Sequence, residues 1–163
     1  MIRTAIRVLS CLALAVLLAG AAAFAGDAPG ELSFAASLFN PKDGGSSWQA
    51  RSEYLIPAGD YVFWGPSGEV FDGPKTDGGA IGAALEVHMG KKCGPGFGAA
   101  AHKLFGDAAD QANWTYEARA LFECGTSTAA FKATARQVWS KDEAGATTEP
   151  DGTIVDAGVV WRF

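Results

Sequence analysis

The chain has 163 residues, a length that fits one domain. Charged residues make up only 19% of the chain and glycine accounts for 21 positions, so neither a disordered polyelectrolyte nor a solvated helical bundle fits this composition. The 18 acidic residues outnumber the 13 Lys and Arg, giving a net charge of −5 that argues against a nucleic-acid partner.

The first 25 residues have the pattern of a secretory signal peptide. Two arginines precede an apolar run at 8–18, and an Ala-Phe-Ala sequence ending at residue 25 provides an expected cleavage site. We therefore expect residues 1–25 to be removed and residues 26–163 to form the exported domain. A membrane anchor and a lipoprotein are the alternatives for this segment, but the apolar run is short for an anchor.

The remaining chain alternates between apolar and polar residues with a period of two, which is typical of strands with two unlike faces. This alternation predicts seven strands, in chain order near residues 32–38, 48–56, 81–89, 97–101, 114–123, 129–136 and 155–163. Residues 60–65 supply an eighth strand. A tight hairpin at Gly65-Pro66-Ser67-Gly68, leading into 69–71, is the alternative for that region.

The connections between these strands alternate in length. Short turns are predicted at 57–59, 93–96 and 124–127, and longer polar links at 40–46, 66–77, 105–111 and 140–152. An up-and-down meander of eight strands would place all the short turns at one end and all the long loops at the other. Bacterial outer-membrane barrels have this asymmetry.

The direction of the apolar face separates two interpretations. In a soluble barrel this face is the core, whereas in a membrane barrel it meets lipid. Within the strands, aromatic residues such as Trp114 and Phe122 fall near the ends, and alanines such as Ala118 fall in the middle. Two rings of aromatic residues suit two bilayer interfaces, so the pattern favours the membrane barrel. A soluble periplasmic, lipocalin-like barrel that binds an apolar ligand is the alternative.

The chain ends Val159-Val160-Trp161-Arg162-Phe163, with apolar residues at every second position before a final Phe. This segment resembles the C-terminal strand of bacterial outer-membrane β-barrel proteins, which the barrel-assembly machinery reads as a signal. The resemblance assigns that role to Val159, Trp161 and Phe163. With the signal peptide and the meander, the chain resembles the small eight-stranded OmpA/OmpX type. This implies an all-β, eight-stranded antiparallel up-and-down transmembrane β-barrel in the bacterial outer membrane.

An eight-stranded barrel has an interior that its own side chains fill. Charged residues of the inward face must be paired there, and we expect Glu117 and Arg119 to meet Lys132 and Arg136 on the neighbouring strand. Such a network would plug the lumen, and a conducting pore is the alternative. The predicted network comprises Arg51, Glu53, Glu86, Glu117, Arg119, Lys132 and Arg136.

Few residues point to catalysis. His88 and His102 occupy adjacent predicted strands, and with Glu86 they are consistent with a metal pair or an acid/base group. Filling of the lumen through hydrogen bonds is the favoured interpretation, because zinc requires three or four close ligands and these are not evident. We therefore expect no enzyme activity, no catalytic residue, no metal site and no cofactor.

Cys93 and Cys124 form an even pair after removal of the leader, in a compartment expected to be oxidising. Both open short turns at the same predicted end, so a disulfide is one hypothesis. Two strands of separation would place them about 10 Å apart, beyond the reach of about 7 Å between Cα atoms. Two separate thiols are the alternative.

The long loops are acidic. We expect solvated carboxylates there, or carboxylates that bridge to lipopolysaccharide phosphates through divalent cations or contact another surface. The expected role is therefore structural or one of surface contact, with outer-membrane lipid, lipopolysaccharide and the barrel-assembly machinery as partners. The acidic loop residues are Asp72, Asp77, Asp107, Asp110, Asp142, Glu143, Glu149 and Asp151.

Overall fold

The computed structural model describes residues 30–39, 47–72, 77–90, 92–110, 112–141 and 152–163. The predicted signal peptide lies outside these residues. Within them the chain forms eight strands and one short 3₁₀ helix. The elements are β1 (Glu31–Phe39), β2 (Ser47–Pro57), β3 (Val62–Asp72), β4 (Asp77–His88), β5 (Cys93–Gly106), η1 (Asp107–Asp110), β6 (Trp114–Gly125), β7 (Ala129–Lys141) and β8 (Gly152–Arg162).

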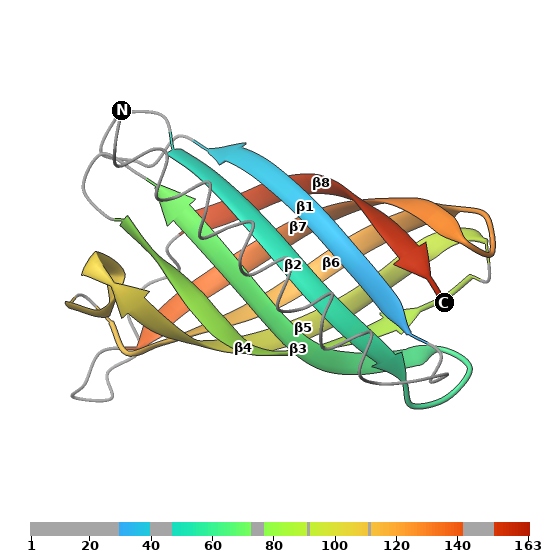
Figure 1. The fold of residues 1–163 in the computed structure, drawn as a ribbon, viewed down its shortest axis with the longest axis horizontal. Helices are drawn as coiled ribbons and strands as arrows, with labels where there is room; N and C mark the ends of the chain where they lie inside the picture. Colours follow the sequence, from blue (N-terminus) through green and yellow to red (C-terminus); the bar gives the residue numbers. More distant parts are fainter. Residues whose placement is uncertain (1–29, 40–46, 73–76, 91, 111, 142–151) are drawn as a thin grey trace.

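The eight strands form a closed barrel in sequence order (Figure 1). Every strand pairs antiparallel with the next one, and β1 closes the ring by pairing with β8. The predicted all-β, eight-stranded antiparallel up-and-down barrel is therefore confirmed. Among the described residues, no helix is long and apolar enough to cross a membrane.

The two ends of the barrel differ in their connections. The β2–β3, β4–β5 and β6–β7 connections lie at one end, together with the C-terminus, on the right of Figure 1. We call this the turn end. The β3–β4 and β5–β6 connections lie at the opposite end, the loop end, where η1 follows β5. Two of the predicted longer links, 40–46 and most of 140–152, lie outside the described residues.

The hairpin alternative for Gly65–Gly68 is wrong, because β3 runs without a turn through all four residues and pairs with both β2 and β4. A Cβ atom at Gly65 would collide with the backbone carbonyl of Tyr54, so glycine permits close strand approach here. Ser67 faces the lumen, where its hydroxyl lies 3.0 Å from Glu53 Oε1. Residue types that often form turns therefore have other roles here: Gly65 allows two strands to approach closely, and Ser67 contacts a charged residue of the lumen.

Two predicted connections need correction. Residues 93–96, predicted as a turn, are the first residues of β5, because β4 ends at His88 and β5 begins at Cys93. The predicted link 66–77 is only 73–76, since β3 continues to Asp72 and β4 begins at Asp77. In each case antiparallel pairing with neighbouring strands holds Gly and Pro residues in extended structure, which overrides their local preference for turns.

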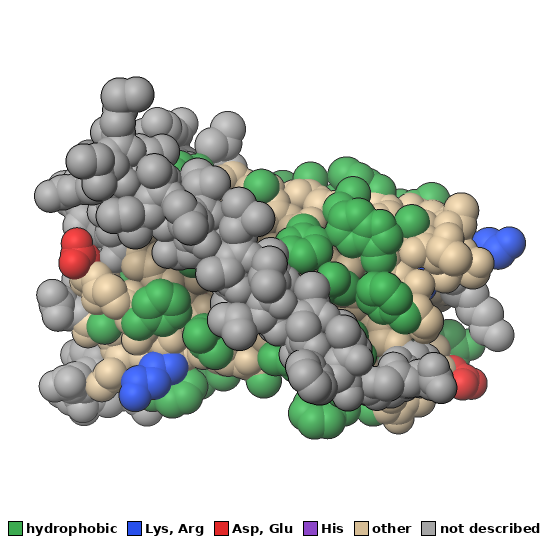
Figure 2. Space-filling view, in the orientation of Figure 1, with side chains coloured by type: hydrophobic (Ala, Val, Ile, Leu, Met, Phe, Trp, Pro, Cys, Tyr) green, Lys and Arg blue, Asp and Glu red, His purple; other side chains and the backbone are tan. Residues whose placement is uncertain are grey.

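The side chains of β6 alternate strictly between exposed and buried from Trp114 to Glu123. Glu117 and Arg119 are buried, whereas Ala118 between them is exposed. The apolar face therefore points outward and the charged face points into the barrel. Hydrophobic side chains cover much of the visible wall, and the visible charged side chains lie toward the two ends (Figure 2). Large exposed hydrophobic residues include Trp64, Ile81, Leu85, Phe97, Phe105, Trp114, Tyr116, Phe122, Phe131, Val155, Val159, Trp161 and Phe163.

Among the described residues, buried apolar side chains pack into two small clusters. One, near the loop end, joins Ala80 and Leu104 to Ala108 of η1 and Ala112. The other joins Leu55, Ala84 and Ala100. Charged and polar side chains occupy much of the remaining interior.

Candidate functional site

Arg119 of β6 lies at the centre of the charged interior. Its Nη1 donates to Glu53 Oε1 at 2.6 Å and to Glu86 Oε1 at 2.8 Å, and its Nη2 contacts Glu117. These carboxylates come from β2, β4 and β6 itself, so one guanidinium connects opposite walls. Gly98 lies between Glu86 and Arg119 in the register of β4, β5 and β6. A Cβ atom there would lie 3.0 Å from Glu86 Cγ and 3.1 Å from Arg119 Cγ, so glycine leaves room for this contact.

Arg136 of β7 forms a second centre nearer the loop end. Its Nη1 donates to Glu117 Oε2 at 2.7 Å and to Glu69 Oε2 at 3.0 Å. Its Nε donates to Asp156 Oδ2 at 2.7 Å, and its Nη2 donates to the side-chain oxygen of Gln49 at 3.0 Å. Glu117 is thus shared between Arg119 and Arg136, which links the two centres.

Lys132 and Arg51 complete the network. Lys132 Nζ lies 2.6 Å from Glu86 Oε2 and 3.6 Å from Glu53 Oε2. Arg51 Nη2 donates to Asp156 Oδ1 at 3.0 Å, which connects β2 to β8 across the β1 strand. Because ion pairs out of water are favourable only when the charges compensate one another, the number of each sign matters. Among the described residues, four cations (Arg51, Arg119, Lys132 and Arg136) meet five carboxylates (Glu53, Glu69, Glu86, Glu117 and Asp156).

The structure brings all seven residues of the predicted network together, with a different pairing. Glu117 contacts Arg136 on the neighbouring strand, as expected. Arg119 instead lies directly opposite Arg136 in the β6–β7 register, and Lys132 reaches Glu86 across the lumen. Cross-strand pairing rules describe only neighbouring strands, so they miss these contacts. Glu69 was missed for another reason, because residues 66–77 were predicted as a long link between strands.

The two histidines have separate partners. His102 Nε2 lies 3.0 Å from Ser67 Oγ, near the middle of the barrel. His88 Nε2 lies 2.9 Å from Glu86 Oε2, and its ring stacks on Phe63 with 4.7 Å between centroids. The predicted grouping of both histidines with Glu86 therefore holds for His88 alone.

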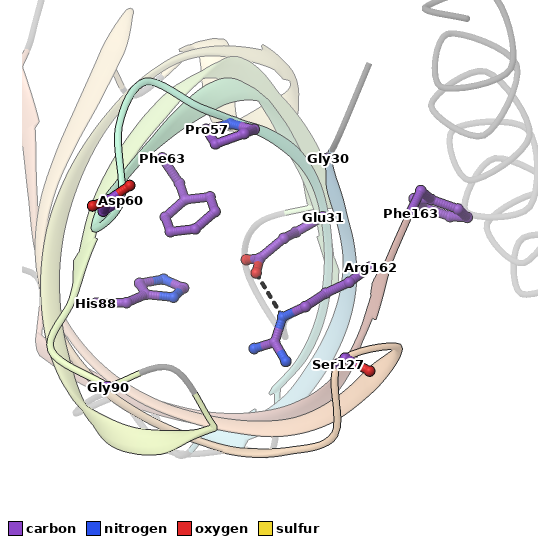
Figure 3. Close-up of a pocket in the computed structure, with 10 residues that line it drawn as sticks. All are labelled: Gly30, Glu31, Pro57, Asp60, Phe63, His88, Gly90, Ser127, Arg162 and Phe163. Carbon is purple, nitrogen blue, oxygen red and sulfur yellow. Dashed lines mark hydrogen bonds and ion pairs between the residues drawn. The ribbon is translucent and has the colours of Figure 1, made fainter. Parts of the chain in front are cut away.

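A cavity of about 470 Å³ opens at the turn end of the lumen (Figure 3). Glu31 and Arg162 face His88 and Phe63 across it, and Asp60 and Ser127 belong to the turns at its rim. Arg162 Nε donates to Glu31 Oε1 at 2.8 Å, and Arg162 Nη2 contacts Glu123. This cavity was not predicted, because its lining comes from five strands and from turns far apart in sequence.

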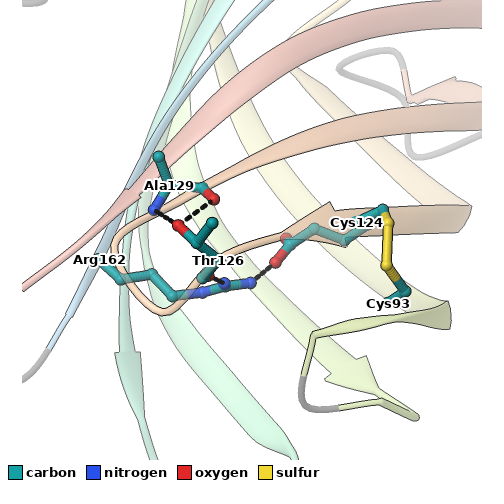
Figure 4. The surroundings of a disulfide bond; sticks show 6 residues. Cys93, Cys124, Thr126, Ala129 and Arg162 are labelled. Carbon is teal, nitrogen blue, oxygen red and sulfur yellow. Dashed lines mark hydrogen bonds and ion pairs between the residues drawn. A yellow bond between two sulfur atoms is a disulfide. The ribbon is translucent and has the colours of Figure 1, made fainter.

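Cys93 and Cys124 form a disulfide at the turn end (Figure 4). The first residue of β5 lies directly opposite the next-to-last residue of β6, with 4.0 Å between the two Cα atoms. The expected separation of about 10 Å was wrong because β5 begins at Cys93 itself, which makes the two cysteines neighbours in one ladder. Both residues are exposed.

A chain of residues 26–163, without Cys11, is expected to contain no free thiol when it is unfolded without reductant, and two after reduction. Thiol titration in denaturant measures both values, and Cys93→Ser provides the matched control because it leaves a single thiol at Cys124. Two reactive thiols in the unreduced chain would refute the bridge.

Residues of the predicted assembly signal lie on the outer wall. Val159, Trp161 and Phe163 are exposed, and Trp161 packs edge to face on Phe34 of β1 with 5.8 Å between ring centroids. Val159 and Trp161 belong to β8, the strand that closes the barrel by pairing with β1 and β7, and Phe163 directly follows it.

The predicted acidic loops are only partly described. Asp72 accepts a hydrogen bond from Trp48 Nε1 at 3.3 Å, which places its carboxylate at the loop end of β3. Asp107 opens η1 after Gly106, whose positive φ of 76° suits glycine. Four of the acidic residues, Asp142, Glu143, Glu149 and Asp151, lie outside the described residues, as do the side chains of Asp77 and Asp110.

No protein-family model matches the chain, and no curated protein sequence matches it. Functional inference therefore depends on the barrel geometry: an exposed apolar wall, a lumen crossed by ion pairs and a cavity at the turn end.

Proposed function

We propose that the chain is an integral outer-membrane β-barrel protein that performs no catalysis of its own. Its lumen is plugged by the charged network, and its acidic outer loops serve envelope structure or surface contact. A signal peptide at residues 1–25 exports it. The observation that carries this proposal is the inverted polarity of the barrel, with apolar side chains outside and charged side chains inside.

The exposed apolar wall supports a lipid environment. Leu85 is 48% exposed, Phe131 53% and Val155 64%, and these residues lie on different strands around the barrel. Soluble monomers rarely expose contiguous apolar patches larger than a few hundred Å². In lipid the same surface costs nothing to expose, since the surrounding chains are equally apolar.

The dimensions and the aromatic residues of the wall agree with this environment. The strands contain 9 to 14 residues, and tilted strands of about 9–11 residues cross a bilayer. On β6, Trp114 and Tyr116 lie toward the loop end and Phe122 toward the turn end, with Ala118 and Ala120 between them. Membrane barrels have aromatic girdles at the two bilayer interfaces in this arrangement.

The alternative, a soluble lipocalin-like barrel, needs an interior that holds an apolar ligand. In this chain the centre of the lumen is occupied by Arg119 and Arg136 with their carboxylate partners. An apolar ligand would have to separate these pairs, which costs several kcal/mol for each buried charge left alone. The same network argues against a wide conducting pore.

The proposed partners follow from the two surfaces. The apolar wall would contact outer-membrane lipid, and carboxylates at the loop end such as Asp72 and Asp107 would bind divalent cations that bridge to lipopolysaccharide phosphates. During insertion, β8 with Val159, Trp161 and Phe163 would be recognised by the barrel-assembly machinery.

The protein is expected in the membrane fraction of a cell envelope and to migrate faster on a denaturing gel when it is not boiled. A closed barrel that resists detergent unfolding until heated gives this mobility difference, and a boiled sample of the same preparation is the control. Recovery in the soluble fraction, with a single band before and after boiling, would contradict the proposal.

A further inference from the structure

Three inward-facing side chains from separate strands converge at the turn end of the lumen. Glu31 begins β1, His88 ends β4 and Glu123 lies two residues before the end of β6. One ligand atom from each of them lies within 4.8 Å of the others, and all three residues are buried. Glu31 and His88 also line the turn-end cavity, which gives an ion a route to the group (Figure 3).

Glu86 determines which nitrogen of His88 is available. Its carboxylate accepts from Arg119 and from Lys132, so it acts toward His88 only as an acceptor. His88 Nε2, 2.9 Å from Glu86, therefore carries the hydrogen, and Nδ1 keeps the lone pair. A carboxylate behind the ligating imidazole is the arrangement that fixes the tautomer in zinc sites. Stacking on Phe63 holds the ring in place.

Glu123 supplies an independent indication of a cation site, because one of its two carboxylate oxygens has no partner within the part of the chain that the structure describes. Its Oε2 is buried without a hydrogen-bond partner among the described residues, while its Oε1 contacts Arg162. The residue is only 5% exposed, so water satisfies little of this oxygen. A carboxylate oxygen buried without a partner is unfavourable, and a bound cation would remove that cost.

We infer that Glu31, His88 and Glu123 form a binding site for a divalent transition-metal cation of the zinc class. One imidazole nitrogen and two carboxylate oxygens are ligands that such ions accept, and a fourth position would remain open to the cavity. Tetrahedral ligands at about 2.0–2.2 Å from zinc lie roughly 3.4 Å apart. The three side chains therefore close on the ion by movements of about 1 Å.

Arg162 competes with the ion. Its guanidinium contacts both Glu31 and Glu123, and its Nη1 also donates to the carbonyl oxygen of Thr126 at 2.5 Å. When the metal binds, the arginine keeps the Thr126 contact and releases the two carboxylates. Because the metal and the guanidinium repel each other, Arg162 lowers the affinity of the site.

Calorimetric titration of the purified, chelator-treated protein with zinc is expected to show one equivalent of bound zinc. His88→Gln weakens this binding by more than about tenfold, the order by which ligand-shell substitutions reduce metal affinity. His102→Gln leaves binding unchanged, since this histidine contacts Ser67 instead. Cobalt added alone gives visible absorption in the original protein and loses it in His88→Gln.

Arg162→Gln provides a test that loss of folding cannot imitate, because it strengthens zinc binding by about tenfold, or about 1.4 kcal/mol. Glu123→Gln weakens binding. The site is overturned by absence of zinc binding to the original protein, by equal effects of the two histidine substitutions, or by unchanged or weaker binding in Arg162→Gln. The titration is the same whether the protein is purified from membrane or soluble fractions, so its result is independent of the proposed localisation.

Discussion

Replacement of Arg119 by Met is expected to lower the free energy of unfolding by about 3–5 kcal/mol, the cost of breaking a buried ion pair by removing one partner. The substitution leaves Glu53, Glu86 and Glu117 without their shared guanidinium in a site from which water is excluded. Denaturant unfolding in detergent or lipid, followed by the fluorescence of the five tryptophans, measures the change.

Lys103→Met is the matched control, because Lys103 is an exposed cation on the outer face of β5, opposite Trp114. Its removal is expected to change the free energy of unfolding by no more than about 1 kcal/mol. Adding Glu53→Gln to Arg119→Met removes one of the stranded carboxylates and recovers part of the loss. Equal effects of Arg119→Met and Lys103→Met would contradict the role assigned to the network.

Ala118→Arg is expected to destabilise the barrel in lipid vesicles by about 2–4 kcal/mol, the cost of placing Arg at the bilayer midplane on the lipid face of a barrel. Ala118 is exposed in the middle of β6, between the aromatic residues at its two ends. On a soluble barrel the same exposed position would tolerate the change within about 0.5 kcal/mol. Unfolding titrations of the original and variant proteins in vesicles give the difference.

Ala129→Arg is the matched control for the depth of the substitution. Ala129 is also exposed and outward-facing, but it is the first residue of β7 at the turn end. Near the interface the expected cost falls to about 0–1 kcal/mol. If the two variants differed little, the apolar wall would be in contact with water and the membrane proposal would fail.

Strand existence and the direction of the side chains could be predicted from the sequence because both depend on local alternation. In β6 apolar and polar residues alternate from Trp114 to Ala120, and the structure exposes the apolar positions and buries the polar ones. A period of two determines which residues share a face whatever the partner strands are. The outward direction of the apolar face could also be predicted, because Trp114 and Phe122 fall near the two ends of the strand rather than in its middle.

Strand ends could not be predicted as well, because they depend on neighbouring strands. Pro66 and Gly68 have the residue types of a turn, yet both lie within β3, where Pro66 pairs with β4 and Gly68 pairs with both β2 and β4. Residues 93–96 were wrongly predicted as a turn in the same way. This prediction placed Cys93 outside the β5–β6 ladder, so the predicted distance between the two cysteines was too long for a disulfide. Closure of the ring imposes a register that no short window of sequence contains.

The candidate metal site was missed because its residues meet only across the lumen. Glu31, His88 and Glu123 are separated by more than 30 positions and belong to strands that are not neighbours. A signal was nevertheless present, since all three have inward parity and lie near the turn end of their strands. Grouping inward residues by their height in the barrel would have placed them in one layer.

The position of Arg119 directly opposite Arg136 constrains how the barrel can assemble. An isolated β6–β7 hairpin would hold two adjacent like charges, which repel. Apart from Glu117, the carboxylates that compensate them reside on β2, β3, β4 and β8, so they arrive only as the sheet curls. Partly formed intermediates therefore gain little from this hairpin. Closure of the barrel is therefore expected to be concerted, so that β1 and β8 pair as the charged interior forms rather than after it.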